Sequence, residues 1–206
     1  MKVVAYEPNH KAQILADALV VLMSGGTVVY PTETSYGLGA DFFSPHAYRT
    51  VYAVKFRGKV KPLPVIVPSR QYAATLVKFT PQASILAERY WPGPLTLVLP
   101  FLYGSQWPHH PDRYLALRVS SNPIAFNLSQ SFGRPLISTS ANISGSEPAY
   151  TAGEAMAQFK SHGVEPDLII DAGEIPRTPP STIVRVDESG VHVLRKGGID
   201  PMKAFS

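Results

Sequence analysis

Helix-start signals alternate with short apolar runs along this chain, and this alternation restricts the fold more than any other feature. A capping side chain followed by proline opens a helix, because the capping oxygen accepts from a free backbone N–H and proline has none to satisfy. That pair occurs at Ser44-Pro45, Thr80-Pro81 and Asn122-Pro123. Three helices are therefore predicted, over residues 45–56, 81–90 and 123–133.

Further helices and a set of short strands complete the predicted pattern. Apolar residues at helical spacing fall between His10 and Ser24, and residues 69–78 read as another helix. Thr151 and Glu154 have the spacing of a capping box, which opens a helix to about Ser161. The β-rich runs are residues 27–30, 63–67, 95–99, 115–119, 135–138, 168–171, 182–186 and 191–194.

Strands that interleave with helices predict an α/β sheet flanked by helices. The last two runs are joined by Asp187-Glu188-Ser189-Gly190, a hairpin turn, so the sheet is predicted to be mixed rather than purely parallel. With 206 residues, 45% of them hydrophobic, the chain can bury one substantial core. We find no internal repeat or linker, and a single domain over residues 1–206 is predicted.

The composition excludes several kinds of site. The chain has no cysteine, so disulfides, thiolate nucleophiles and cysteine-ligated metals are ruled out. The six histidines include the adjacent pair His109-His110, which lacks the i, i+4 spacing of a helical zinc site, and no metal site is predicted. No signal-peptide or membrane-spanning pattern is found, so we expect a soluble, cytoplasmic protein with no membrane partner.

A long stretch of the sequence carries positive charge alone. Residues 42–87 contain no acidic side chain. Their cations are Arg49, Lys55, Arg57, Lys59, Lys61, Arg70 and Lys78. The hydroxyl-rich segment 31–39 precedes this stretch directly, and together the two predict a pocket for a phosphate-bearing small molecule. The chain lacks both the P-loop and the complete dinucleotide fingerprint, so phosphates must be held in another way.

Two groups of residues can be interpreted either as purely structural or as functional. Lys55 and Arg57 could be solvated cations in the last turn of a helix, but Lys59 and Lys61 follow without a neutralising carboxylate, which favours a polyphosphate clamp. The segment from Ser138 to Gly145 supplies hydroxyls and an amide after a strand, as ligand sites do in α/β sheets. Turn and capping bonds explain that segment equally well.

Three residues stand out by their position in predicted strands. Arg118 interrupts the apolar run 115–119, where a buried cation needs either a ligand or an ion-pair partner; the sequence leaves both open. Arg195 ends the last predicted strand, and Ser181 lies at the start of the preceding one. Taken singly, each of these two is more often structural.

The chain resembles the YrdC-like proteins in six motifs that occur in the family's order. These are Pro31-Thr32-Glu33-Thr34-Ser35-Tyr36-Gly37-Leu38-Gly39, Lys55-Phe56-Arg57, Lys61-Pro62-Leu63, Trp91-Pro92-Gly93-Pro94-Leu95-Thr96, Ser138-Thr139-Ser140-Ala141-Asn142 and Ser181-Thr182-Ile183-Val184. The resemblance covers nearly the whole chain and is closest to the short, single-domain members. It implies a twisted α/β sheet around a deep, positively charged cavity.

This resemblance also implies an activity and a set of contacts. The activity is threonylcarbamoyl-AMP synthase, which makes threonylcarbamoyl-AMP and pyrophosphate from L-threonine, bicarbonate and ATP for the N6-threonylcarbamoyladenosine modification of tRNA. Lys55 and Arg57 are the implied catalytic residues. The implied ATP contacts are Lys55, Arg57, Lys61, Ser138, Ser140, Asn142 and Arg195, and the implied threonine contacts are Thr34, Arg118 and Ser181.

The same resemblance implies that magnesium arrives with ATP and that a tRNA threonylcarbamoyl transferase complex takes the product. Gly58 departs from the family, which usually has proline after the arginine. Two other hypotheses stay open: a module that binds double-stranded RNA or tRNA through its basic surface, and a paralogue of the same fold without synthase activity. Weak RNA binding is also compatible with a synthase.

Overall fold

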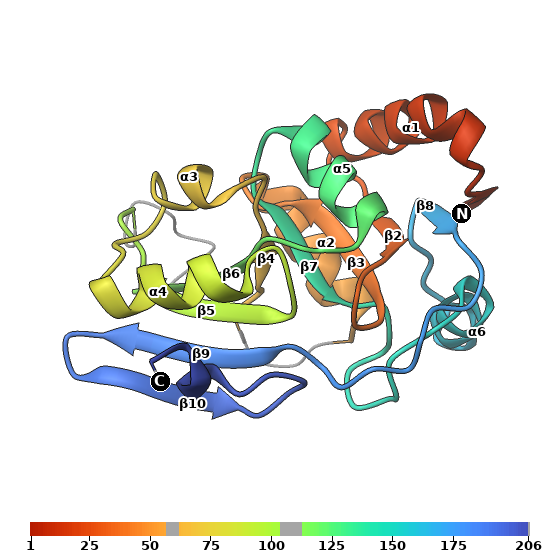
Figure 1. The fold of residues 1–206 in the computed structure, drawn as a ribbon. Coiled ribbons are helices and arrows are strands. Elements are labelled where there is room, and N and C mark those ends of the chain that lie inside the picture. Colours follow the sequence, from red (N-terminus) through yellow and green to blue (C-terminus); the bar gives the residue numbers. More distant parts are fainter. Residues whose placement is uncertain (57–61, 104–112, 206) are drawn as a thin grey trace.

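The computed structural model describes residues 1–56, 62–103 and 113–205. Ten strands form one mixed sheet in the order β1-β8-β2-β3-β7-β4-β6-β5-β9-β10, and helices lie against both of its faces (Figure 1). The strands are β1 (Lys2–Ala5), β2 (Val28–Pro31), β3 (Tyr36–Asp41), β4 (Val65–Ile66), β5 (Leu95–Pro100), β6 (Tyr114–Arg118), β7 (Leu136–Ser140), β8 (Leu168–Asp171), β9 (Thr182–Asp187) and β10 (Gly190–Arg195).

Helix starts follow the capping signals of the sequence. The helices are α1 (Lys11–Met23), α2 (Pro45–Val54), α3 (Arg70–Ala73), α4 (Pro81–Tyr90), α5 (Pro123–Phe132) and α6 (Ala152–Ser161), with 3-10 turns η1 (Pro8–His10) and η3 (Pro201–Ala204). The side chains of Ser44, Thr80 and Asn122 each accept from a backbone N–H in the first turn of the helix that follows. Thr151 and Glu154 form the predicted capping box. These helix predictions are confirmed.

The mixed sheet is confirmed as well. Strand β8 pairs in parallel with β1 and β2, and β5 pairs in parallel with β9. Strand β7 pairs antiparallel with both β3 and β4, while β9 and β10 form the predicted closing hairpin. No helix among the described residues is long and apolar enough to cross a membrane.

Several element predictions were wrong. Strands β1 and β3 were not predicted. The helix expected over residues 69–78 ends at Ala73, because the next turn joins the sheet: Val77 forms a β-bridge with Phe101, and Lys78 N donates to Pro100 O. The strand expected over residues 63–67 is only the pair Val65–Ile66. Helix α2 ends at Val54, two residues early, and the chain leaves it through Phe56, which has a φ of 48°.

Each face of the sheet has its own apolar core. The first packs under α1 and α5 and includes Leu22, Tyr30, Ile66 and Leu136. The second, larger core packs under α2, α4 and α6 on the opposite face. Side chains alternate between faces along a strand, so the residues two positions after Leu136 and opposite Ile66 point to the α1–α5 side. Ser138 and Arg118 are those residues.

Candidate active site

On the α1–α5 face of the sheet, strand β3 has glycine at two alternate positions, Gly37 and Gly39. The register sets Gly37 between Tyr30 and Ser140, and Gly39 opposite Ser138. A Cβ atom at Gly39 would lie 2.6 Å from Cε1 of Tyr30. Gly39 therefore makes room for the Tyr30 ring within a strand, whereas a Cβ atom at Gly37 would lie 3.3 Å from Cγ2 of Thr32. The two glycines were expected to follow a turn at a phosphate pocket, and that expectation was wrong about their place in the fold.

Tyr30 places a buried phenol beside charged groups. Its side chain is fully buried, and its hydroxyl lies near Ser138 without the geometry of a hydrogen bond to any described residue. Burial raises the pKa of Tyr30 to about 12; Ser138 and the positive charge of Arg118 lower the pKa by less, and the negative charge of Glu33 adds to the rise. Tyr30 thus shares one local environment with both charged residues.

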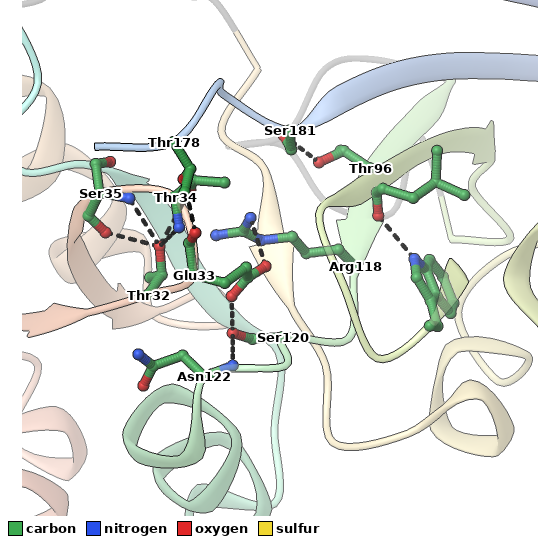
Figure 2. A network of polar contacts seen from close by, with 12 residues as sticks. Thr32, Glu33, Thr34, Ser35, Thr96, Arg118, Ser120, Asn122, Thr178 and Ser181 are labelled. Carbon is green, nitrogen blue, oxygen red and sulfur yellow. Dashed lines mark hydrogen bonds and ion pairs between the residues drawn. The ribbon is translucent and has the colours of Figure 1, made fainter. Parts of the chain in front are cut away.

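The turn before β3 is organised by the hydroxyl of Thr32. That oxygen accepts from the backbone N–H groups of Thr34 and Ser35, and it can donate to the backbone oxygen of Ser35 at 2.7 Å (Figure 2). The hydroxyls of Thr32 and Thr34 lie 3.1 Å apart. Either hydroxyl can be the donor in that contact. In both cases the Thr34 oxygen keeps a lone pair for a donor on a ligand, as far as the described residues are concerned.

Arg118 and Glu33 form a buried ion pair next to this turn. Nη1 of Arg118 lies 2.9 Å from Oε1 of Glu33, with 10% and 12% of the two side chains exposed. The contact lacks hydrogen-bond geometry, and no described residue accepts a hydrogen bond from the guanidinium. The other carboxylate oxygen of Glu33 accepts from the Ser120 hydroxyl. Figure 2 shows the Arg118 side chain reaching from β6 toward Glu33 and the threonine turn.

A second guanidinium lies close by on β10. Arg195 donates from Nε and Nη2 to the Ser181 backbone oxygen at 3.1 and 2.9 Å, and from Nη2 to the Ser181 hydroxyl at 2.9 Å. The Ser181 hydroxyl also lies 2.9 Å from that of Thr96. Burial lowers the pKa of Arg195, and the positive charge of Arg118 lowers it further. Two cations therefore face one region of the sheet.

The ammonium group of Lys55 joins the end of α2 to the loop after β7. Lys55 is 3% exposed, and its ammonium donates to the backbone oxygens of Ser140 and Asn142 and to Asn142 Oδ1, at 2.5, 2.9 and 3.0 Å. The Ser140 hydroxyl donates to the same Oδ1 at 2.6 Å. The backbone of Phe56, just after this lysine, is in the left-handed region, a conformation that costs free energy and often marks functional sites.

Backbone hydrogen bonds hold these groups at one end of β3. Ala141 N donates to Tyr36 O, and Tyr36 N donates to Ala149 O, both at 2.8 Å. Ser144 N in the same loop donates to Lys55 O at 3.0 Å. The loop of residues 141–149 therefore lies between the threonine turn and the end of α2.

The structure brings together most of the predicted site residues. Thr34, Arg118, Ser181 and Arg195 belong to one neighbourhood, and Lys55, Ser140 and Asn142 belong to the other. Ser138 lies on the shared face of the sheet. Arg57, Lys61 and the pair His109-His110 lie outside the described residues.

Sequence reasoning missed Glu33, Tyr30 and Thr96 as members of the site. Glu33 and Thr96 lie inside motifs that carried the family resemblance, yet only their neighbours were assigned roles. The possibility that Arg118 has an ion-pair partner was raised, and an acidic residue in the segment 31–39 was the available signal. Nothing in the sequence distinguished Tyr30 from an ordinary strand residue.

Comparisons with known proteins identify the family of the chain. A model of the Sua5/YciO/YrdC family, described under telomere recombination, matches residues 20–197. The chain belongs to this family. A relative from Mycobacterium tuberculosis with the provisional name of threonylcarbamoyl-AMP synthase is 33% identical over 195 residues, which cover 94% of this chain and 88% of the relative.

Two further comparisons lead to Pyrococcus abyssi. Its threonylcarbamoyl-AMP synthase is 36% identical over 182 residues, covering 86% of this chain and 52% of that protein. The crystal structure of P. abyssi Sua5 complexed with L-threonine is 31% identical, with a TM-score of 0.87, and the match covers 98% of this chain and 60% of that one. The chain therefore spans little more than half the length of these archaeal relatives.

Proposed function

We propose that this chain is a threonylcarbamoyl-AMP synthase, which joins L-threonine, bicarbonate and ATP and releases pyrophosphate. Membership of the Sua5/YciO/YrdC family and the names of its relatives support the activity. One structural observation carries the proposal: Arg118 is 8% exposed, and no described residue accepts a hydrogen bond from its guanidinium. A buried guanidinium with free N–H donors is suited to a carboxylate ligand.

The surroundings of Arg118 suit the rest of an amino acid. Its planar fork matches the threonine carboxylate. The Thr34 hydroxyl oxygen can accept from the threonine ammonium or hydroxyl, and Ser181 lies on the other side of the arginine (Figure 2). In this arrangement Arg118 binds the acid group of the substrate, and the hydroxyls beside it bind its other polar groups.

The nucleotide is proposed to bind at the loop held by Lys55. Ser140 and Asn142 line that loop, and Ser138 and Arg195 extend the polar surface toward the threonine end. The three N–H groups of Lys55 are directed to protein oxygens, so its main contribution is to fix the loop that contacts ATP. Arg57 and Lys61, outside the described residues, are proposed to contact the phosphates directly.

This chemistry needs no nucleophile from the protein. The threonine amine forms a carbamate, either with bicarbonate and loss of water or with carbon dioxide and loss of a proton. A carbamate oxygen then attacks the α-phosphate while pyrophosphate leaves. The protein aligns the reactants and stabilises charge on the phosphates, effects worth several kcal/mol in a site that excludes water. Magnesium is proposed to arrive bound to ATP, as it commonly does for nucleotide phosphates.

The cellular setting is also part of the proposal. Threonylcarbamoyl-AMP would pass to a tRNA threonylcarbamoyl transferase complex in the cytoplasm, for N6-threonylcarbamoyladenosine formation. Weak binding to RNA through the basic stretch would assist that transfer.

Pyrophosphate release from ATP with bicarbonate, measured with and without L-threonine, tests the activity. Release should require threonine, and mass spectrometry should find threonylcarbamoyl-AMP. Lys55→Ala and Arg57→Ala should abolish release, while Lys78→Ala is the matched control, because the Lys78 side chain is 63% exposed and pairs with Glu188. No release under any condition, together with salt-sensitive RNA binding, would favour a binding module or an inactive paralogue.

A further inference from the structure

We infer that Glu33 is a positioning residue, which orients the Arg118 guanidinium for the carboxylate of the substrate. The inference rests on the proposed function, because it assigns Arg118 to the threonine carboxylate. Glu33 would act through Arg118 without touching the substrate itself.

Glu33 is held more firmly than a surface carboxylate. Its Oε2 accepts from the Ser120 hydroxyl, and Ser120 Oγ in turn accepts from Asn122 N at the start of α5 at 3.2 Å. Its backbone oxygen accepts from the Thr178 hydroxyl at 2.9 Å. Ser120 thus fixes the carboxylate of Glu33 and Thr178 fixes its backbone, as Figure 2 shows.

Arg118 needs such an anchor because its surroundings do not otherwise fix its head group. The side chain of arginine has many rotamers. A second cation, Arg195, is also close enough that the positive charge of Arg118 contributes to lowering the pKa of Arg195. Repulsion between the two guanidiniums would push the Arg118 head group away from β10, toward the β3 side of the sheet. Glu33, at 2.9 Å on that side, gives the head group a fixed position.

The geometry of the ion pair leaves Arg118 available to a ligand. In a bidentate pair, two N–H groups of the arginine would be used by the carboxylate. Here Oε1 of Glu33 meets Nη1 without hydrogen-bond alignment, so the pair holds the head group by charge. The same oxygen is buried from solvent, which excludes it as a contact for the substrate in this conformation.

The test is Glu33→Gln, which keeps the shape of the side chain and removes its charge. We expect the KM for threonine to rise about tenfold, the size of one charge-assisted contact, with the KM for ATP changed less than about twofold. Asp41→Asn is the matched control: Asp41 is also a buried carboxylate, paired with Arg134 at 3.3 Å at the far end of β3. It should leave both KM values unchanged.

The alternatives predict other results. If Glu33 only stabilises the fold, the melting temperature falls in both variants and the threonine KM changes in neither. If Glu33 competes with the substrate for Arg118, its removal lowers the threonine KM. Either result overturns the inference. Wild-type protein without threonine-dependent pyrophosphate release would instead refute the proposed function, and the inference with it.

Two more variants keep the inference testable if Glu33→Gln does not fold. Ser120→Ala removes the anchor of one carboxylate oxygen and should raise the threonine KM in the same direction, by a smaller factor. Combining it with Arg118→Lys should give less than the product of the separate effects, because both act through one guanidinium. Independent effects on the threonine KM would contradict the inference.

Discussion

The ammonium group of Lys55 lies 3.0 Å from Oδ1 of Asn142 and 2.9 Å from the backbone oxygen of the same residue. Its third bond goes to the backbone oxygen of Ser140. An ammonium has three N–H donors, and these three oxygens account for them. A lysine at the C-terminus of α2 thereby fixes the loop after β7, although the two segments are more than 80 residues apart along the chain.

Lys55→Met should therefore weaken the fold as well as the activity. The substitution keeps most of the side-chain volume but leaves buried oxygens without a donor, so the free energy of unfolding should fall by about 2 kcal/mol or more. Urea denaturation measures the change. Lys78→Met, at an exposed position, should change it by less than about 0.5 kcal/mol. Equal decreases in the free energy of unfolding of the two variants would mean that Lys55 does not stabilise the loop after β7.

Arg118→Lys should affect threonine more than ATP. Lysine keeps the charge but has no planar fork, so the contact to a carboxylate becomes a single bond. We expect the threonine KM to rise about tenfold and the ATP KM to change little. Steady-state kinetics with each substrate varied in turn gives both values. Equal increases would mean that Arg118 does not hold the threonine carboxylate.

Gly39→Ala should destabilise the protein. The added methyl group would lie 2.6 Å from the buried Tyr30 ring and 3.2 Å from the backbone oxygen of Ile137. Overpacking of this kind costs about 1–3 kcal/mol. Gly153→Ala is the control, because it lies in α6 with its nearest neighbour 3.8 Å away, and alanine there should stabilise the helix by up to about 1 kcal/mol. Chemical denaturation should give opposite signs for the two changes.

Alkaline pH should destabilise the wild-type protein more than Tyr30→Phe. The pKa of Tyr30 is raised from 10.0 to about 12, so between these values the folded state holds a proton that the unfolded state has lost. Stability is complete below about pH 10 and falls as pH rises to about 12, by a total of roughly 3 kcal/mol. Denaturation at several pH values should show the wild type losing this amount relative to the phenylalanine variant. Parallel curves would mean that the phenol ionises freely.

Most of the fold was predictable because its signals are local. The caps at Ser44, Thr80, Asn122 and Thr151 act within one helical turn, and each works as the sequence indicates. The missed strand β3 depends on a contact between strands, since Gly39 is explained only by the Tyr30 ring of the neighbouring strand β2. A propensity argument treats glycine as a turn former and cannot anticipate that contact.

The site residues that belong to recognised motifs were predictable, whereas the ion-pair partner of a site residue was not. Lys55, Ser140 and Asn142 were predicted through their motifs, and they meet in the structure. The partner of Arg118 was not predicted, because Glu33 reaches it across 85 residues of sequence only after the sheet forms. Composition shows that a buried arginine needs an anion, but it does not show which one.

The first strand of the chain, β1, pairs with β8, a strand that is synthesised much later. Strand β1 pairs only with β8 among the described strands, so Lys2 lies opposite Leu168. During synthesis, residues 2–5 must wait unpaired until about 165 more residues have left the ribosome. Strand β2 also waits for β8 on one of its edges. Ribosome-bound fragments that stop before β8 should therefore be easily digested at their N-terminus, and protection should appear abruptly once β8 emerges.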